Sequence, residues 1–74
     1  MPTVTVATEV AGKVWKVLVR VGDAVAADQD LAIVESMKME IPVCAPAAGT
    51  VRQVLVAEGE PVAEGQAFVE LQTG

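Results

Sequence analysis

The sequence predicts an all-β fold, a flattened β-sandwich of two four-stranded antiparallel sheets with pseudo-two-fold symmetry. Its 74 residues suffice for one small domain, near the lower limit at which a hydrophobic core alone holds a fold. The apolar residues are mostly Val and Ala with a few Leu and Ile, and this β-branched bias favours strands over helices. The third observation is an internal repeat, which predicts the symmetry.

The repeat emerges when the chain is shifted along itself. A shift of 49 − 12 = 37 residues places GKVWKVLVRVGDAVAADQDLAIV over GTVRQVLVAEGEPVAEGQAFVEL without a gap. Identical residues stand at Gly12/Gly49, Val14/Val51, Val17/Val54, Leu18/Leu55, Val19/Val56, Gly22/Gly59, Val25/Val62, Ala26/Ala63 and Gln29/Gln66. The chain is therefore expected to be a single domain over 1–74, with copies over about 2–34 and 39–71.

Each copy contains the pattern of about four short strands. The first is the alternating apolar segment that begins each copy, such as Val4 to Val6. In the second, the pattern Val-x-x-Val-x-Val over 14–19 and 51–56 breaks strict alternation once, as a β-bulge would. Gly-Asp or Gly-Glu then marks a turn, and a short strand and a second loop precede the last apolar strand.

One copy cannot cover both faces of its own sheet, so two similar sheets are expected to pack face to face. Four valines of the second strands are predicted to be buried from both sheets: Val17, Val19, Val54 and Val56. Four glycines are interpreted as turn and bulge positions only: Gly12, Gly22, Gly49 and Gly59.

The two residues left between the copies, Met37 and Lys38, are predicted to form a hairpin loop near the pseudo-axis. The hairpin strands are Leu31–Ser36 and Met39–Cys44, and both chain ends are expected at the opposite end of the domain. A two-residue loop prefers Asn-Gly or Asp-Gly, because a type I′ turn needs positive φ at both positions. Met-Lys is a poor choice for that backbone.

In the same register Glu35 and Glu40 stand directly opposite one another, which costs a few tenths to about 1 kcal/mol. Two local rules are thus broken at one tip, and such violations are expected at functional sites. A solvated Lys38 flanked by methionines that fill the core is the alternative interpretation. The position of Lys38 on the symmetry point favours a site instead.

Charge and residue types exclude several classes of function. Ten acidic against five basic residues give a net charge of −5, which argues against nucleic acid or an anionic membrane and favours basic protein partners. Cys44 is the sole cysteine, and neither a signal peptide nor a membrane-spanning run is evident, so a soluble, reducing, cytoplasmic setting is expected. The absence of His argues against a catalytic metal or a Ser-His nucleophile.

The run Glu35-Ser36-Met37-Lys38-Met39-Glu40 closely resembles the E-[AS]-M-K-M motif of biotinyl domains. The resemblance extends over AGKVWKVLVRVGDAV upstream and CAPAAGTVRQVLVAEGEPVAEGQAFVEL downstream, hence over nearly the whole chain. It is greatest for the small free-standing biotin/lipoyl attachment proteins and biotin carboxyl carrier domains, and implies their barrel-sandwich hybrid fold. The ungapped repeat leaves no room for the thumb that some of these carriers insert.

The resemblance implies a non-catalytic carrier whose Lys38 receives covalent biotin from a biotin protein ligase. The arm would then visit a biotin carboxylase, which loads carboxylate, and a carboxyltransferase, which passes it on. Met37 and Met39 are assigned to ligase recognition and to packing beside the arm. Glu35 and Glu40 are interpreted as guides for basic partner surfaces, with solubility as the alternative. A monomer is expected.

Two further residues are interpreted as structural. Trp15, between Lys13 and Lys16, is interpreted as a partly covered strand residue, with a partner contact as the alternative. Cys44 occupies the position of Ala7 in the other copy and is expected to be small and semi-buried, without a role for its thiol.

Two rival functions belong to different classes. The first is a lipoyl carrier of a 2-oxo acid dehydrogenase-type complex, with lipoate on Lys38, although lipoyl domains usually present their lysine in a D-K-[AS] context. The second is an unmodified β-module used only for protein contacts. Methionine on both sides of Lys38 argues against the first, and a lysine at the tip argues against the second.

Overall fold

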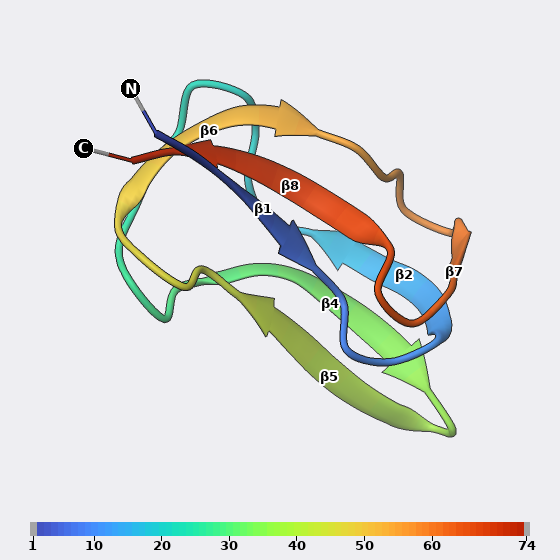
Figure 1. The fold of residues 1–74 in the computed structure, drawn as a ribbon. Coiled ribbons are helices and arrows are strands. Elements are labelled where there is room, and N and C mark those ends of the chain that lie inside the picture. Colours follow the sequence, from blue (N-terminus) through green and yellow to red (C-terminus); the bar gives the residue numbers. More distant parts are fainter. Residues whose placement is uncertain (1, 74) are drawn as a thin grey trace.

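The computed structural model describes residues 2–73 as eight β-strands, with no helix among them (Figure 1). The strands in chain order are β1 (Thr3–Ala7), β2 (Gly12–Val17), β3 (Ala24–Val25), β4 (Asp30–Ser36), β5 (Met39–Cys44), β6 (Gly49–Val54), β7 (Pro61–Val62) and β8 (Ala67–Gln72). Met1 and Gly74, the ends of the expected domain 1–74, lie outside the described residues. The predicted all-β sandwich is confirmed.

The two sheets have the strand orders β1-β8-β6-β3 and β5-β4-β2-β7, and all pairs are antiparallel. Shifting the chain by the repeat length carries β1 onto β5, β2 onto β6, β3 onto β7 and β4 onto β8. Each sheet therefore contains two strands from each copy, so neither copy forms a sheet of its own. Because the copies are interleaved, one copy alone lacks the neighbours that satisfy its backbone hydrogen bonds.

Both second strands contain the predicted bulge. In the pairing of β2 with β4 the register jumps between Val14 and Lys16, which leaves Trp15 as the extra residue. In the pairing of β6 with β8 the register jumps between Val51 and Gln53, which leaves Arg52 in the equivalent place. A bulge re-aims the side chain of its extra residue, and in both strands that side chain is exposed.

The glycine interpretation is right for one pair and wrong for the other. Gly22 and Gly59 lie in turns at φ 96° and 88°, where a side chain would be strained. Gly12 and Gly49 instead begin β2 and β6 with ordinary φ, and the reason for glycine is space. A Cβ on Gly12 would collide with the backbone oxygen of Glu35, and one on Gly49 would lie 2.6 Å from that of Gln72.

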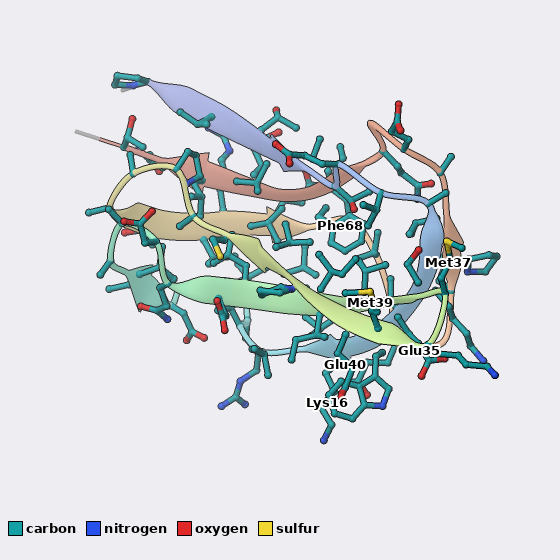
Figure 2. All side chains as sticks on the ribbon, turned by 90° about the horizontal axis from the view of Figure 1, so that it is seen from below. Lys16, Glu35, Met37, Met39, Glu40 and Phe68 are labelled. Carbon is teal, nitrogen blue, oxygen red and sulfur yellow. The ribbon has the colours of Figure 1, made fainter. Side chains whose placement is uncertain are left out.

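The core lies between the sheets and is aliphatic except for Phe68, as Figure 2 shows. Val19 and Val56 are buried as predicted, but Val17 and Val54 are only half-buried. Both are the last residues of their strands, where fewer neighbouring segments cover them. The valines that precede the bulges, Val14 and Val51, take the central positions and are each 1% exposed.

The sandwich is elongated, with principal extents of 36 × 18 × 16 Å. The described chain ends lie together, because Thr3 pairs with Gln72 and the Thr73 N–H donates to the Pro2 carbonyl at 2.9 Å. The turn between β4 and β5 lies at the opposite end (Figure 1). The predicted separation of hairpin tip and termini is confirmed.

Candidate functional site

The site is the β4–β5 hairpin, which follows the predicted register. Ser36 pairs with Met39, so Met37 and Lys38 are the two loop residues. Their φ values are 51° and 66°, the left-handed conformation that a type I′ turn requires at both positions. For a residue other than glycine, this conformation costs about 1–2 kcal/mol. The fold thus places strained backbone at its tip, as the sequence predicted.

All three side chains at the tip are exposed. Met37 is 94% exposed and Met39 63%, so neither methionine fills the core. The Lys38 side chain is exposed between them. The alternative interpretation of the methionines as core residues is therefore wrong. The arrangement presents a primary amine to a partner between two flexible apolar side chains, which can adapt to the surface that covers them.

The base of the hairpin carries two facing acids. Glu35 and Glu40 are a directly opposed pair on β4 and β5, and both are exposed (Figure 2). Glu35 also lies opposite Lys13 of β2 on its other side. Within residues 2–73 the sole side-chain ion pair joins Arg52 to Glu70, so Glu35 and Glu40 have no cationic partner there. Their negative charge remains available to an approaching partner.

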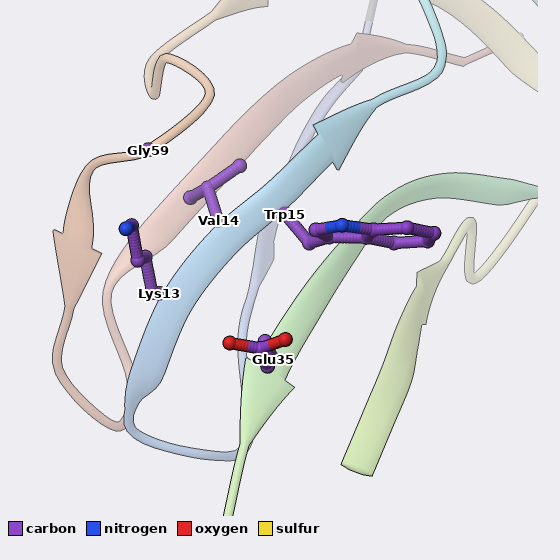
Figure 3. A pocket seen from close by; sticks show the side chains of 5 residues that line it. All are labelled: Lys13, Val14, Trp15, Glu35 and Gly59. Carbon is purple, nitrogen blue, oxygen red and sulfur yellow. The ribbon is translucent and has the colours of Figure 1, made fainter. Parts of the chain in front are cut away.

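A shallow hollow of about 210 Å³ adjoins the hairpin on the outer side of the β5-β4-β2-β7 sheet. Lys13, Val14, Trp15, Glu35 and Gly59 line it, and Figure 3 shows the indole of Trp15 extending from β2 toward β4. Trp15 is 44% exposed, and the Lys16 amine lies 5.6 Å from its ring centroid, within cation–π range. Trp15 stands out in the sequence, but its position beside Glu35 does not follow from the sequence, because no local pattern predicts which strand becomes the neighbour of β2.

Cys44 is exposed, which corrects the expectation of a semi-buried residue. Its Sγ donates a hydrogen bond to the Asp30 carboxylate at 3.3 Å. That hydrogen bond, with smaller contributions from burial and from the charges of Asp30 and Asp28, raises the pKa of the thiol. Because the thiolate is the reactive form, this shift lowers the reactivity of the Cys44 thiol.

Residues 2–73 contain neither a metal-ligating cluster nor a membrane-spanning helix. These residues contain no group of three or more His, Cys, Asp or Glu side chains that could hold a metal ion. No helix long and apolar enough to cross a membrane is present in this part of the chain.

A family model described as Biotin-requiring enzyme matches residues 1–71 of this chain. The chain belongs to the biotin/lipoyl attachment family. One member, the biotin/lipoyl attachment protein of Bacillus subtilis, is 48% identical over 67 residues, which cover 90% of this chain and 92% of that protein. The sequence resemblance stated above is thereby confirmed.

Other members of the family are much longer. The dihydrolipoyllysine-residue acetyltransferase component of the pyruvate dehydrogenase complex of Azotobacter vinelandii is 39% identical over 61 residues, which cover 82% of this chain and 10% of that protein. The urea carboxylase of Kluyveromyces lactis contains a matching fold with a TM-score of 0.91 and 30% identity, covering 97% of this chain and 6% of that one. The proteins similar to this chain therefore include a biotin/lipoyl attachment protein, a carboxylase and a dihydrolipoyllysine-residue acetyltransferase component.

Proposed function

We propose that this chain is a biotin carboxyl carrier and that Lys38 is its attachment residue. The observation that carries the proposal is the presentation of Lys38. Its exposed amine stands on a left-handed two-residue turn between exposed Met37 and Met39, at the far end of an elongated domain. No partner has to unfold the chain to reach the Lys38 amine, because the side chain is already exposed on the turn.

Attachment requires an acyl transfer to Lys38. A biotin protein ligase supplies the vitamin as an acyl-adenylate, and the unprotonated Nζ attacks its carbonyl carbon. The amide C–N bond forms, the bond to the adenylate oxygen breaks, AMP leaves and the amine proton passes to a base. Since free lysine titrates near 10.4, the ligase must assist this deprotonation.

The residues of the hairpin fit a tethered biotin group. The exposed side chain of Lys38, extended by the acyl chain, gives an arm that reaches about 12–15 Å from the backbone. The six-residue strand β5 and seven-residue strand β4 hold the base of that arm in a paired ladder. When bound, biotin supplies a ureido nitrogen that accepts and releases carboxylate. The protein tethers this group and raises its concentration at a biotin carboxylase and then at a carboxyltransferase.

Lipoate on the same lysine is the second candidate, because the family includes lipoyl-bearing relatives such as the one from Azotobacter vinelandii. The neighbours of Lys38 favour biotin. The adenylated vitamin is offered from an apolar ligase pocket, where two thioethers can be covered favourably. A carboxylate beside the nucleophile, as in the D-K-[AS] context, would instead have to be desolvated.

The deciding experiment is co-expression of the chain with a biotin protein ligase, followed by intact mass measurement and an avidin blot. We expect one biotinyl group on the parent chain and none on Lys38→Arg. The free energy of unfolding of the variant, obtained from its thermal melt, should stay within roughly ±0.5 kcal/mol of the parent value, because an exposed tip residue adds little to packing. Avidin-reactive Lys38→Arg protein would refute the assignment of the site, and a lipoyl mass on the parent chain would favour the second candidate.

A further inference from the structure

The outer side of β2 and β4, next to the hairpin, carries an unusual set of side chains for this chain. We call it the β2 face and define it by Lys13, Trp15, Lys16, Ile33 and Glu35. In the register of β2 and β4, Lys13 lies opposite Glu35 and Lys16 lies opposite Ile33, so these four residues share one side of the sheet. Trp15, the bulge residue, lies among them with Lys16 over its ring.

The pseudo-symmetry supplies an internal control for this surface. Shifting by the repeat length carries the residues of the β2 face onto Thr50, Arg52, Gln53, Glu70 and Gln72 of the other sheet. That counterpart has the same bulge, yet it holds no aromatic residue, and its cation Arg52 is paired with Glu70 at 3.4 Å. Within residues 2–73 Lys13 and Lys16 form no ion pair. The exposed indole and the two free cations are therefore not demanded by the fold.

The tip alone is too small to be the whole recognition surface. A specific complex buries about 800 Å² on each partner, roughly a fifth of the 4440 Å² that this domain exposes. A two-residue loop cannot supply that area. The β2 face is continuous with the tip, because Glu35 belongs both to this face and to the hairpin strand that leads to Met37 and Lys38.

We propose that the β2 face is the surface on which the biotin protein ligase docks when it modifies Lys38. The inference rests on the proposed function and adds the chemistry of the contact. The ligase meets Lys13 and Lys16 with an acidic surface and receives the Trp15 indole in an apolar recess. A half-exposed tryptophan can lose its remaining exposed area on binding, which is the usual behaviour of an anchor residue.

The charge pattern fixes the orientation of the partner. Glu35 and Glu40 make the base of the hairpin negative, whereas Lys13 and Lys16 make the adjoining strand positive. A partner with the complementary pattern is attracted in one orientation and repelled in the reverse one. The hollow of about 210 Å³ between Lys13, Trp15 and Glu35 offers room for one side chain of that partner (Figure 3). Docking in this orientation directs the Lys38 amine to the enzyme.

The test compares variants of the β2 face with variants at the equivalent positions of the other sheet, and the two double variants have the same net charge. Lys13→Thr with Lys16→Gln gives the β2 face the residues of its counterpart and takes the net charge from −5 to −7. Thr50→Glu with Gln53→Glu adds the same two negative units at the equivalent positions of the other sheet. Trp15→Ala tests the anchor, and Arg52→Ala at the equivalent bulge position is its control, although it also removes one positive charge and the ion pair with Glu70. Thermal melts of all four variants establish that each one folds.

The measurement is the rate of biotin incorporation by a purified ligase at varied carrier concentration. We expect KM to rise roughly tenfold for each β2-face variant and to change less than about twofold for each control, with kcat unaltered. The KM of the parent should rise with salt, and that of Lys13→Thr with Lys16→Gln should rise less. With ¹⁵N-labelled parent and added ligase, the Trp15 indole and β2 amide signals should broaden more than those of β1 and β8.

Equal KM values for face and control variants would overturn the docking surface while leaving the proposed function intact. A lower KM for Lys13→Thr with Lys16→Gln would overturn it too, since the partner would then be basic. A concentration-dependent dimer of the parent that Trp15→Ala abolishes, with KM unchanged, would assign the face to a second copy instead. No biotin on the parent chain with any ligase would overturn both the function and the docking surface.

Discussion

Met37 and Lys38 occupy backbone that neither residue type prefers. Among residues 2–73 the non-glycine positions with positive φ are these two and Asp28. The usual Asn-Gly loop would relieve the strain, but it would remove the amine and its apolar neighbour. The turn therefore exposes an amine and an apolar side chain at a cost in local backbone energy, as is typical of functional positions.

The proposed attachment of biotin to Lys38 yields a prediction about the two methionines that flank it. Met37→Asp with Met39→Ala should shift modification from biotin toward lipoate, because the new tip resembles the D-K-[AS] context. The sandwich should be undisturbed, since both side chains are exposed. The measurement is a competition between biotin and lipoate ligases, read by intact mass. Equal biotin incorporation rates for the double variant and the parent would show that the ligase reads only the hairpin shape and the lysine position.

At the scale of the element, the turns show how closely the two copies match. The Ala26 N–H donates to the Gln29 side chain at 3.0 Å, and the Ala63 N–H donates to the Gln66 side chain at 3.1 Å. The left-handed residue inside the first turn is Asp28, at φ 67°, whereas the second turn has Gly65 at φ 82°. The same left-handed turn conformation is thus adopted by an aspartate in the first copy and by a glycine in the second.

This difference yields a stability prediction. Asp28→Gly should stabilise the fold by about 0.5–1 kcal/mol because glycine adopts positive φ without a steric penalty. Gly65→Ala should destabilise it by about 1 kcal/mol, since a Cβ there meets nothing within 4 Å and the strain comes from φ alone. Urea unfolding of both variants and the parent measures the two effects. A loss of stability in Asp28→Gly would mean that the carboxylate contributes more than the strain costs.

At the scale of the whole molecule, stability comes from the small aliphatic core between interleaved sheets. Val14 and Val51 are each 1% exposed, whereas Val17 and Val54 lie at the edge of the core. The free energy of unfolding of a 74-residue domain is small, so the loss caused by truncating a single core side chain should be measurable. Because each sheet contains strands from both copies, a substitution that destabilises one sheet destabilises both copies.

The core prediction compares central and edge valines. Val14→Ala or Val51→Ala should lower the free energy of unfolding by about 1–3 kcal/mol, because truncation leaves a cavity that cannot relax fully. Val17→Ala or Val54→Ala should lower it by less than about 1 kcal/mol, because solvent already reaches these side chains. Thermal and urea unfolding measure the series. Equal losses at all four positions would show that half-burial at the strand ends contributes as much as central burial.

The features that depend on local pattern and on the repeat can be predicted from the sequence alone. The all-β class, the bulges, the separation of the tip from the termini, and the exposed Met37-Lys38 turn with Glu35 opposite Glu40 all follow from it. These features depend on alternation, turn chemistry and the repeat length, which are visible along one chain. The strongest of them, the placement of Lys38 between the copies, needs no knowledge of which strands pair across the molecule.

The way in which the two sheets share strands from both copies is visible in the folded chain but not in the sequence. The same holds for the packing of Gly12 against the Glu35 backbone, for the exposure of Cys44 beside Asp30, and for the hollow that Trp15 shares with Glu35. Each of these features depends on which distant segments become neighbours. Hydrophobic alternation determines which side of a strand is buried, but several strand orders satisfy the same alternation, and packing of the complete core selects one of them.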